Sequence, residues 1–482
     1  MAAGRAARAG RRRGRGATLL MALGLAACRE GPPAPPPPPR DTTAPRLEIV
    51  QPGGAFGFDR DSNGLVDLEV RWTDSGGAVA LSTLRVRSRP GPPGVPEDTN
   101  LARGWTLHRL DSTGAILEES VPLLLRPGDY FLVVSVADTA GNAATVTSPA
   151  FSVPVASFHR SIGLDYRPEW QQVRGVNLAL NPEGTKGYVP FIDGHVAVFD
   201  PEGREPTRYI GPIANSGFAA QISVDTATGL AYIGGGGQET AGYSVLDTRT
   251  EQYLGWHWAG GLGLASVYVH DSRLFVGESC TNGRIFVYDK ATHTELARVQ
   301  VGAVGVPGSC PNSRAFEVTS DGRVGWAATV EAGLVWFNAE RYSLLGILDI
   351  EPPSTNGRMG NARDIKLLGD RWLYLARLGW GLDEYDVRMM TLASHAGDAR
   401  DYKELALSPD GRLLFATCSA DDGRPPPIQA HKLYRVPGLQ LLHAFPQRPG
   451  LIADAAVFHP DGKRVFVMAS FQVDVYLIRP QP

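Results

Sequence analysis

The stretch Leu405 to Ser419, LALSPDGRLLFATCS, decides the fold, together with its echo from Ala456 to Ser470, AVFHPDGKRVFVMAS. Each predicts a short apolar strand, a Pro-Asp-Gly turn and a second apolar strand that ends in small polar residues. The proline of each turn presets φ for the second turn position, and Gly411 and Gly462 give the backbone the freedom that chain reversal requires. The sequence therefore predicts antiparallel hairpins built to a common plan.

Comparable hairpins recur through the last two thirds of the chain at a spacing of roughly 40 to 50 residues, a period at which propellers are expected. Their seven turns are predicted at 181–184, 225–229, 270–271, 320–322, 369–370, 408–411 and 459–462. A third strand follows in each unit and most often closes on an aspartate, at Asp200, Asp247, Asp289 and Asp386. The fourth, sixth and seventh units carry Asn338, Arg435 and Leu477 instead, which predicts a less regular turn in those units.

This pattern resembles the YVTN and LVIVD repeats of bacterial seven-bladed β-propellers, which are distantly similar to WD-repeat proteins. The resemblance covers residues 154–482 and implies a propeller there. The seventh unit ends after its third strand, Val473 to Ile478, whereas Ser157 to Leu164 precedes the first unit as a strand without a hairpin. Pairing these two strands closes the ring and removes the sheet edges that the ends otherwise expose.

Residues 42–153 form a separate unit in the sequence. Asp41 to Pro45, DTTAP, resembles the opening of bacterial immunoglobulin-like domains, and Tyr130 to Asn142, YFLVVSVADTAGN, resembles their closing strand and turn. Alternating apolar runs lie between them at the spacing of a β-sandwich. The fold class expected for the whole chain is thus all-β, with a small immunoglobulin-like β-sandwich followed by a seven-bladed β-propeller.

A loop in the first unit has the spacing of a calcium-binding loop of EF-hand type. Its oxygen ligands would come from Asp59, Asp61, Asn63, the Leu65 carbonyl and Asp67, with Gly64 at the sharp bend. The twelfth position is Val70, where a bidentate glutamate is expected. Two hypotheses stay open: a weak structural calcium site, or a turn held by bonds from its side chains to its backbone.

The amino terminus has the pattern of an export signal. Residues 1–27 carry six arginines, no acid and an apolar run from Ala17 to Ala27 that is too short to span a bilayer. Leu25-Ala26-Ala27-Cys28 resembles the bacterial lipobox, which implies cleavage before Cys28 and lipidation of that thiol. Residues 28–41 would be a proline-rich tether. Arg29, rather than aspartate, follows Cys28, so the resemblance implies an anchor in the outer membrane of the cell envelope.

The net charge of the mature chain limits the classes of partner that are expected. Loss of the six signal arginines lowers the formal net charge from −3 to −9, which argues against nucleic acid as a partner.

In an oxidising envelope Cys280 and Cys310, predicted on connections at the same face of neighbouring blades, either form a disulfide or remain two thiols. Cys418 is expected to be a small buried residue at a strand end.

Candidate binding residues fall at the starts of the innermost strands, around the predicted channel mouth. They are Arg314, Arg363, Asp364, Arg400, Asp401 and Asp454, with Lys403 and Glu404 nearby. One interpretation is an ionic channel mouth that binds an anionic ligand, a carbohydrate-like ligand or a protein partner. The other is that the arginines and aspartates form ion pairs between blades. His270 and His459 fall in predicted hairpin turns, where they are expected to face solvent.

Two functional hypotheses follow. The first is a lipid-anchored cell-envelope binding or scaffold protein, which uses the propeller face for a protein, peptide or glycan partner. The alternative is an extracytoplasmic propeller enzyme of lyase or lactonase type, which requires a cluster of acid–base side chains on one face. No catalytic motif is recognisable in the sequence, and no cofactor is implied beyond the calcium considered above.

Overall fold

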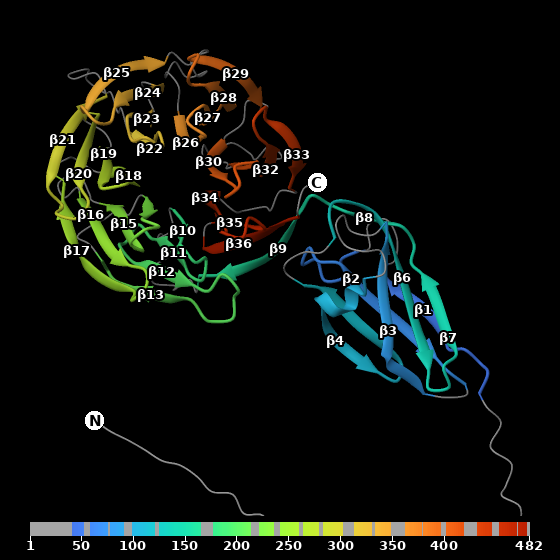
Figure 1. Cartoon of the computed structure of the whole chain (residues 1–482). Helices are drawn as coiled ribbons and strands as arrows, with labels where there is room; N and C mark the ends of the chain where they lie inside the picture. The colour runs from blue at the N-terminus through green and yellow to red at the C-terminus, as the bar shows by residue number, and fades with distance from the viewer. Residues whose placement is uncertain are drawn as a thin grey trace, which may run out of the picture.

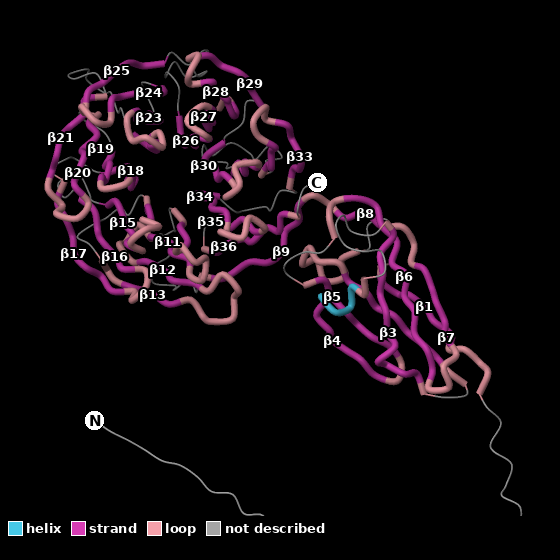
Figure 2. Tube along the Cα trace, in the orientation of Figure 1, coloured by secondary structure: helices cyan, strands magenta, loops and turns pink. Residues whose placement is uncertain are grey.

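The computed structural model describes residues 41–52, 58–75, 78–90, 99–120, 125–164, 177–213, 221–235, 242–259, 264–278, 283–301, 313–329, 333–348, 362–377, 379–396, 402–418, 431–445, 453–469 and 471–479. This part of the chain is almost entirely β and builds four-stranded antiparallel sheets (Figures 1 and 2). None of its helices is long and apolar enough to cross a membrane. The signal sequence and Cys28 lie outside the described residues.

Two sheets make up the N-terminal unit, which ends at Val153 (Figure 1). One has the order β1-β2-β5-β4 and the other has the order β3-β6-β7, with β8 also paired to β6. The elements are β1 (Arg46–Gln51), β2 (Asp67–Thr73), β3 (Val79–Arg89), the 3-10 helix η1 (Leu101–Gly104), β4 (Trp105–Asp111), β5 (Gly114–Glu119), β6 (Gly128–Asp138), β7 (Ala143–Thr147) and β8 (Phe151–Val153).

The two sheets of this unit share one apolar core. Trp72 of β2 and Leu117 of β5 pack in the same cluster as Val86 of β3 and Val134 of β6, and all four are buried. Alternation along β6 sends Leu132, Val134 and Val136 inward, as expected for strands with one face on a core.

Seven sheets follow around a ring, numbered here as ring sheets 1 to 7 (Figure 1). Their strands in chain order are β10 (Ala179–Leu180), β11 (Gly187–Pro190), β12 (Val196–Phe199) and β13 (Arg208–Ile210) in sheet 1; β14 (Ile222–Val224), β15 (Leu230–Gly235), β16 (Gly242–Asp247) and β17 (Gln252–Trp258) in sheet 2; β18 (Leu264–His270), β19 (Arg273–Glu278), β20 (Arg284–Asp289) and β21 (Glu295–Gln300) in sheet 3; β22 (Ser313–Val318), β23 (Val324–Thr329), β24 (Gly333–Asn338) and β25 (Ser343–Leu348) in sheet 4; β26 (Ala362–Leu368), β27 (Trp372–Arg377), β28 (Gly381–Asp386) and β29 (Thr391–Ala396) in sheet 5; β30 (Tyr402–Leu407), β31 (Leu413–Cys418), β32 (Lys432–Arg435) and β33 (Gln440–Ala444) in sheet 6; β34 (Ala453–Phe458), β35 (Arg464–Ala469) and β36 (Gln472–Ile478) in sheet 7.

The fourth strand of ring sheet 7 is β9 (Ala156–Gly163), which comes from the start of the ring. It pairs antiparallel with β36, from Gln472 opposite Gly163 to Ile478 opposite Ala156. The pairing predicted for these two segments is therefore confirmed. Because β9 directly follows the N-terminal unit, the same strand closes the ring and connects the two units (Figure 1).

The hairpin turns have the predicted chemistry. Gly411 N donates to Ser408 O, and Gly462 N donates to His459 O, at 2.9 Å in each case. Both glycines have positive φ, +68° and +70°, a conformation that other residues rarely adopt. The turn at Asn338 is more regular than predicted. The side-chain oxygen of Asn338 accepts a hydrogen bond from Glu340 N, just as the carboxylate of Asp200 accepts one from Glu202 N.

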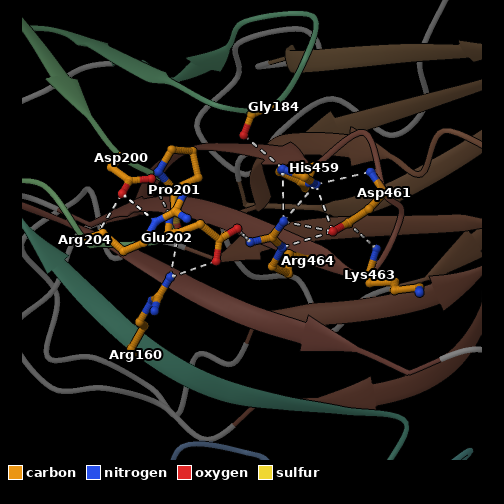
Figure 3. A network of polar contacts seen from close by, with 10 residues as sticks. All are labelled: Arg160, Gly184, Asp200, Pro201, Glu202, Arg204, His459, Asp461, Lys463 and Arg464. Carbon is orange, nitrogen blue, oxygen red and sulfur yellow. Dashed lines mark hydrogen bonds and ion pairs between the residues drawn. The ribbon is translucent and has the colours of Figure 1, made fainter. Parts of the chain in front are cut away.

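A polar network joins ring sheets 7 and 1 at the point of closure (Figure 3). Arg464 binds Asp461 at 2.9 Å and also pairs with Glu202, while His459 lies 3.0 Å from the carbonyl oxygen of Gly184. The prediction that His459 faces solvent is wrong: only 9% of the residue is exposed, because its ring fills the space between the two sheets. His270 likewise keeps only 15% of its side chain exposed.

Candidate functional site

A cavity of about 320 Å³ lies at the centre of the ring and is called here the channel. Residues on or beside the first strands of all seven ring sheets line it. Among the described residues that line the channel, the charged ones all belong to ring sheets 4, 5 and 6, and they are Glu317, Asp364, Lys366 and Glu404. Ring sheets 7 and 1 contribute mainly apolar surface, from Leu178, Ala179, Leu180, Ala455, Ala456 and Val457. The channel therefore has an ionic wall and an apolar wall.

Three neighbouring sheets place polar side chains at one depth of the ionic wall. Tyr268, Glu317 and Lys366 lie opposite Phe275, Trp326 and Tyr374, the third residues of three equivalent second strands. The phenol of Tyr268 donates a hydrogen bond to Glu317 Oε2 at 3.2 Å. Lys366 Nζ lies 3.9 Å from Glu317 Oε1 on the other side of that carboxyl group.

Asp364 completes the ionic wall from two residues before Lys366. Its Oδ1 lies 3.1 Å from Lys366 Nζ and accepts a hydrogen bond from Ile365 N. Its Oδ2 accepts a hydrogen bond from Leu405 N of ring sheet 6, at 2.8 Å. The carboxylate thus connects ring sheets 5 and 6 while it holds the lysine, and only 2% of it is exposed.

Burial and charge control protonation in this wall. Burial raises the pKa of Glu317 to about 7, although the ammonium group of Lys366 acts in the opposite direction. Burial lowers the pKa of Lys366, but Asp364, Glu317 and Glu404 outweigh it, so that the net shift is upward. Burial also raises the pKa of the Tyr268 phenol. The upward shift keeps Lys366 charged at neutral pH, and a pKa of about 7 places the titration of Glu317 near neutrality.

The predicted mouth residues are only partly within the described chain. Arg314 and Arg363 are the second residues of β22 and β26, and both are half-buried. Within the described residues, Asp364 pairs with Lys366 and with neither arginine. Arg400 and Asp401 lie outside the described residues, and so does the side chain of Asp454. Cys280 and Cys310 also lie outside them, whereas Cys418 is the last residue of β31 and is buried.

The repeat pattern predicted Asp364 as a site residue with Glu404 nearby, but it did not predict Tyr268, Glu317 or Lys366. One signal was available: Glu317 and Lys366 each interrupt an apolar strand, in Phe316-Glu317-Val318 and Ile365-Lys366-Leu367. A charged residue inside an otherwise apolar strand is poorly solvated when neighbouring sheets cover that strand, so such a residue is expected to have a charged or hydrogen-bonding partner.

The loop proposed for calcium contains a carboxylate cluster. Ligand atoms of Asp59, Asp61 and Asp67 all lie within 4.8 Å of one another. Burial is the main cause of the raised pKa of both Asp59 and Asp67, and the charge of Asp61 adds to it. Asn63 fits less well, because its side-chain oxygen accepts a hydrogen bond from Leu65 N. The oxygen atoms of the three aspartates are close enough to hold a hard cation, so the calcium site stays a prediction.

This loop also contacts the ring unit. His159 Nδ1 donates to Asn63 O at 2.6 Å, and Ser157 Oγ donates to Gly64 O at 3.2 Å. Gly64 has φ of +81°, and a Cβ placed on it would lie 2.7 Å from Phe158 O. The glycine is therefore required by the turn and by the close approach of β9, whether or not calcium binds.

No family model matches the sequence, and no curated protein matches it.

Proposed function

We propose that the ring is a seven-bladed β-propeller, that the N-terminal unit is an immunoglobulin-like spacer, and that Cys28 anchors the protein by lipid in the outer membrane. Its function in this proposal is to bind or scaffold an envelope protein, peptide or glycan through the propeller face. Consecutive four-stranded sheets, with a first strand that completes the last sheet, support the propeller. Two sheets over one core support the sandwich.

The observation that carries the binding function is the channel with its ionic and apolar walls. Ligand sites are concave and combine apolar surface with a few convergent polar groups. Arg314 and Arg363 stand at the start of the same strands that carry Glu317 and Lys366. In this proposal the partner occupies that end of the ring, where Arg400, Asp401 and Asp454 are also expected from the sequence.

A capture experiment tests this function. A soluble chain of residues 41–482, which contains every described strand, is used to capture proteins and glycans from envelope extract. It is compared with a variant that carries Arg363→Ala, Arg400→Ala and Asp454→Ala, and with a control that carries Arg298→Ala, Arg323→Ala and Glu340→Ala on exposed positions outside the channel. We expect a partner that the parent and the control retain and the mouth variant loses. Equal capture by all three chains would refute the site.

One observation favours the second candidate, an extracytoplasmic propeller enzyme of lyase or lactonase type. Tyr268, Glu317 and Lys366 converge in the channel, and the pKa of Glu317 near 7 suits a group that gives and takes a proton at neutral pH. Turnover screening against uronate-containing glycans and lactones, with Glu317→Gln as the inactive comparison, tests it. Equal turnover by the parent and Glu317→Gln would exclude this cluster as the catalytic group.

A further inference from the structure

We propose that the mouth of the channel binds an acidic peptide in an extended conformation. A carboxylate of the peptide binds the guanidinium group of Arg363, and the peptide backbone lies along the open edges of the innermost strands. The inference rests on the proposed binding function, because it specifies the chemistry of the partner at the same face. The strands that carry it are β22, β26 and β30, the first strands of ring sheets 4, 5 and 6.

Arg363 is a cation without a counter-ion among the described residues. Its side chain is half-buried, and its Nε atom is buried and has no hydrogen-bond acceptor. None of the described residues forms an ion pair with it. Arg314, Lys403 and Glu404, in contrast, each have an interaction partner. A partly desolvated guanidinium group gains from a carboxylate, whose two oxygens match its planar donors.

A β-bulge places Arg363 at the start of its strand. Ala362 and Asp364 pair with Arg377 and Ala376, which are consecutive residues of β27. Arg363 is therefore an extra residue that has no opposite partner in the ladder. The first strands of ring sheets 3, 4 and 7 have the same irregularity between their first and third residues. Bulges of this kind redirect side chains and are frequent next to functional sites.

The innermost strands offer backbone groups to a peptide. β22, β26 and β30 each pair with one strand only, and they lie nearest the centre of the ring (Figure 1). Side chains already bind these strands: Gln221 Nε2 donates to Arg314 O at 2.6 Å, and Leu405 N donates to Asp364 Oδ2 at 2.8 Å. The first of these is an amide-to-carbonyl bond, as a peptide backbone makes when it adds to a strand edge. An acidic glycan has carboxylates but no repeating backbone amides.

The neighbouring carboxyl groups are compensated within the protein. Asp364 lies 3.1 Å from Lys366 Nζ and accepts the hydrogen bond from Leu405 N. The same Lys366 Nζ lies 3.9 Å from Glu317 Oε1. Because these buried carboxyl groups have a cation beside them, they leave the charge of Arg363 available to a ligand.

Isothermal titration calorimetry on residues 41–482 tests the proposal at low salt and about pH 8. The probe is an acetylated and amidated Gly-Glu-Gly-Glu-Gly-Glu peptide. The same peptide with glutamine in place of glutamate has no charge, and the same peptide with lysine has the opposite charge. Trigalacturonate carries carboxylates on a sugar chain. We expect the glutamate peptide to bind, and the other three probes to bind at least about tenfold more weakly.

Substitutions locate the binding. Arg363→Ala should weaken binding of the glutamate peptide by about tenfold or more. Arg363→Lys should lose only part of the affinity, because an ammonium group keeps the charge but not the planar pair of donors. Arg388→Ala is the matched control and should change the affinity by less than about twofold. Arg388 is an exposed arginine in the turn after β28, at the opposite end of the same ring sheet.

Thermal unfolding separates recognition from a structural role. The side chain of Arg363 has a buried Nε without an acceptor, so Arg363→Ala should unfold at the temperature of the parent or above it. A side chain that holds the ring together would lower that temperature when removed. Loss of peptide binding accompanied by a lower unfolding temperature would overturn the assignment to Arg363.

Different results would overturn the two proposals. Suppose that the mouth captures an envelope partner but the glutamine peptide binds as tightly as the glutamate peptide, or Arg363→Ala behaves like Arg388→Ala. The acidic peptide is then excluded, and the binding function stands. If the glutamate peptide binds through Arg363 but envelope extract yields no partner, the peptide site stands and the envelope partner does not. Tighter binding of trigalacturonate than of the glutamate peptide would replace the peptide by an acidic glycan.

Discussion

Arg479 and Glu119 form an ion pair between the two units of the protein, with 2.8 Å between Nη1 and Oε2 and with both side chains completely buried. Arg479 follows β36, the last strand of the ring, and Glu119 ends β5 of the N-terminal unit. The same guanidinium donates to Gly64 O and Leu125 O, and Glu119 Oε1 accepts a hydrogen bond from Leu125 N. These contacts make the junction a fixed connection rather than a loose linker.

Breaking this pair should therefore destabilise both units together. Arg479→Met or Glu119→Gln removes one charge of this buried ion pair, and we expect a loss of about 3 to 5 kcal/mol in the free energy of unfolding. Urea denaturation of residues 41–482 measures it. The double variant should lose less than the sum of the two single losses. Arg323→Ala removes a pair with Glu340 in which both side chains are exposed, and it should change stability by less than about 0.5 kcal/mol. Single variants as stable as the parent would contradict this role.

Closure of the ring should depend on Arg464. Its side chain binds Asp461, His459 and Glu202 and is only 7% exposed, so Arg464→Ala should cost about 2 to 3 kcal/mol, measured by thermal unfolding. Lys463→Ala, next to it, makes no ion pair among the described contacts and should have little effect. If both variants unfold at the same temperature, the network in Figure 3 does not hold the ring closed.

The same network predicts an acid dependence. Burial opposes ionisation of Asp461, but hydrogen bonds from His459 and Lys463 N and the charge of Arg464 outweigh it and lower the pKa to about 2. The unfolded value is about 3.9, so the resulting stability of about 2 kcal/mol is fully present above about pH 4 and is lost as the pH falls towards 2. Stability curves of the parent and of Asp461→Asn should converge in that interval. Parallel curves would show that Asp461 is not responsible.

His431 should make the protein sensitive to milder acid. Its ring packs near Phe415 and Tyr476, and its Nδ1 accepts a hydrogen bond from Cys418 N. Burial lowers its pKa to about 4, below the unfolded value of about 6.5, so the unfolded chain binds more protons between these values. Stability of about 3 kcal/mol is present above pH 6.5 and is lost as the pH falls to 4. His431→Gln should flatten this slope, and His108→Gln, on an exposed ring, should not.

The calcium hypothesis has a direct test. If the loop of Asp59, Asp61 and Asp67 binds calcium, the dissociation constant should be about 10⁻⁴ to 10⁻³ M, as in extracellular modules, and about 5 mM calcium should stabilise the protein by about 1 to 2 kcal/mol. Asp61→Asn should abolish the effect, because the one hydrogen bond that Asp61 makes within the described part of the loop is long, at 3.3 Å from Asn63 N. Asp111→Asn, in another turn of the same unit, is the control. Equal unfolding temperatures with calcium and with chelator would contradict calcium binding and would favour a turn that only contacts β9.

A thiol count tests the cysteine hypothesis. Residues 41–482 contain Cys280, Cys310 and Cys418. If Cys280 and Cys310 form a disulfide, the denatured chain has one reactive thiol, and if both are free it has three. Mass mapping without reductant identifies the pair. Cys418→Ala should lower the count to zero if the disulfide is present.

Local sequence features explain which parts of the fold could be predicted. Turns such as Ser408 to Gly411, the alternation of β6 and the β9–β36 pairing follow from turn residues and strand periodicity, which are encoded within a few positions of the chain. The last ring sheet differs from the others for a local reason, because its fourth strand is β9 from the start of the ring, and Arg479 after β36 binds Glu119 of the first unit.

The sequence by itself thus determined the all-β class, the repeated hairpins and the strand that completes the last sheet. Only the tertiary structure brought Tyr268, Glu317, Lys366 and Asp364 to one wall, because they span almost a hundred residues and lie on three different sheets. It also gave the Asp59 to Asp67 loop its contact with β9, which no spacing within the loop reveals. Hairpins depend on neighbours in sequence, whereas the channel depends on where complete sheets pack around a ring.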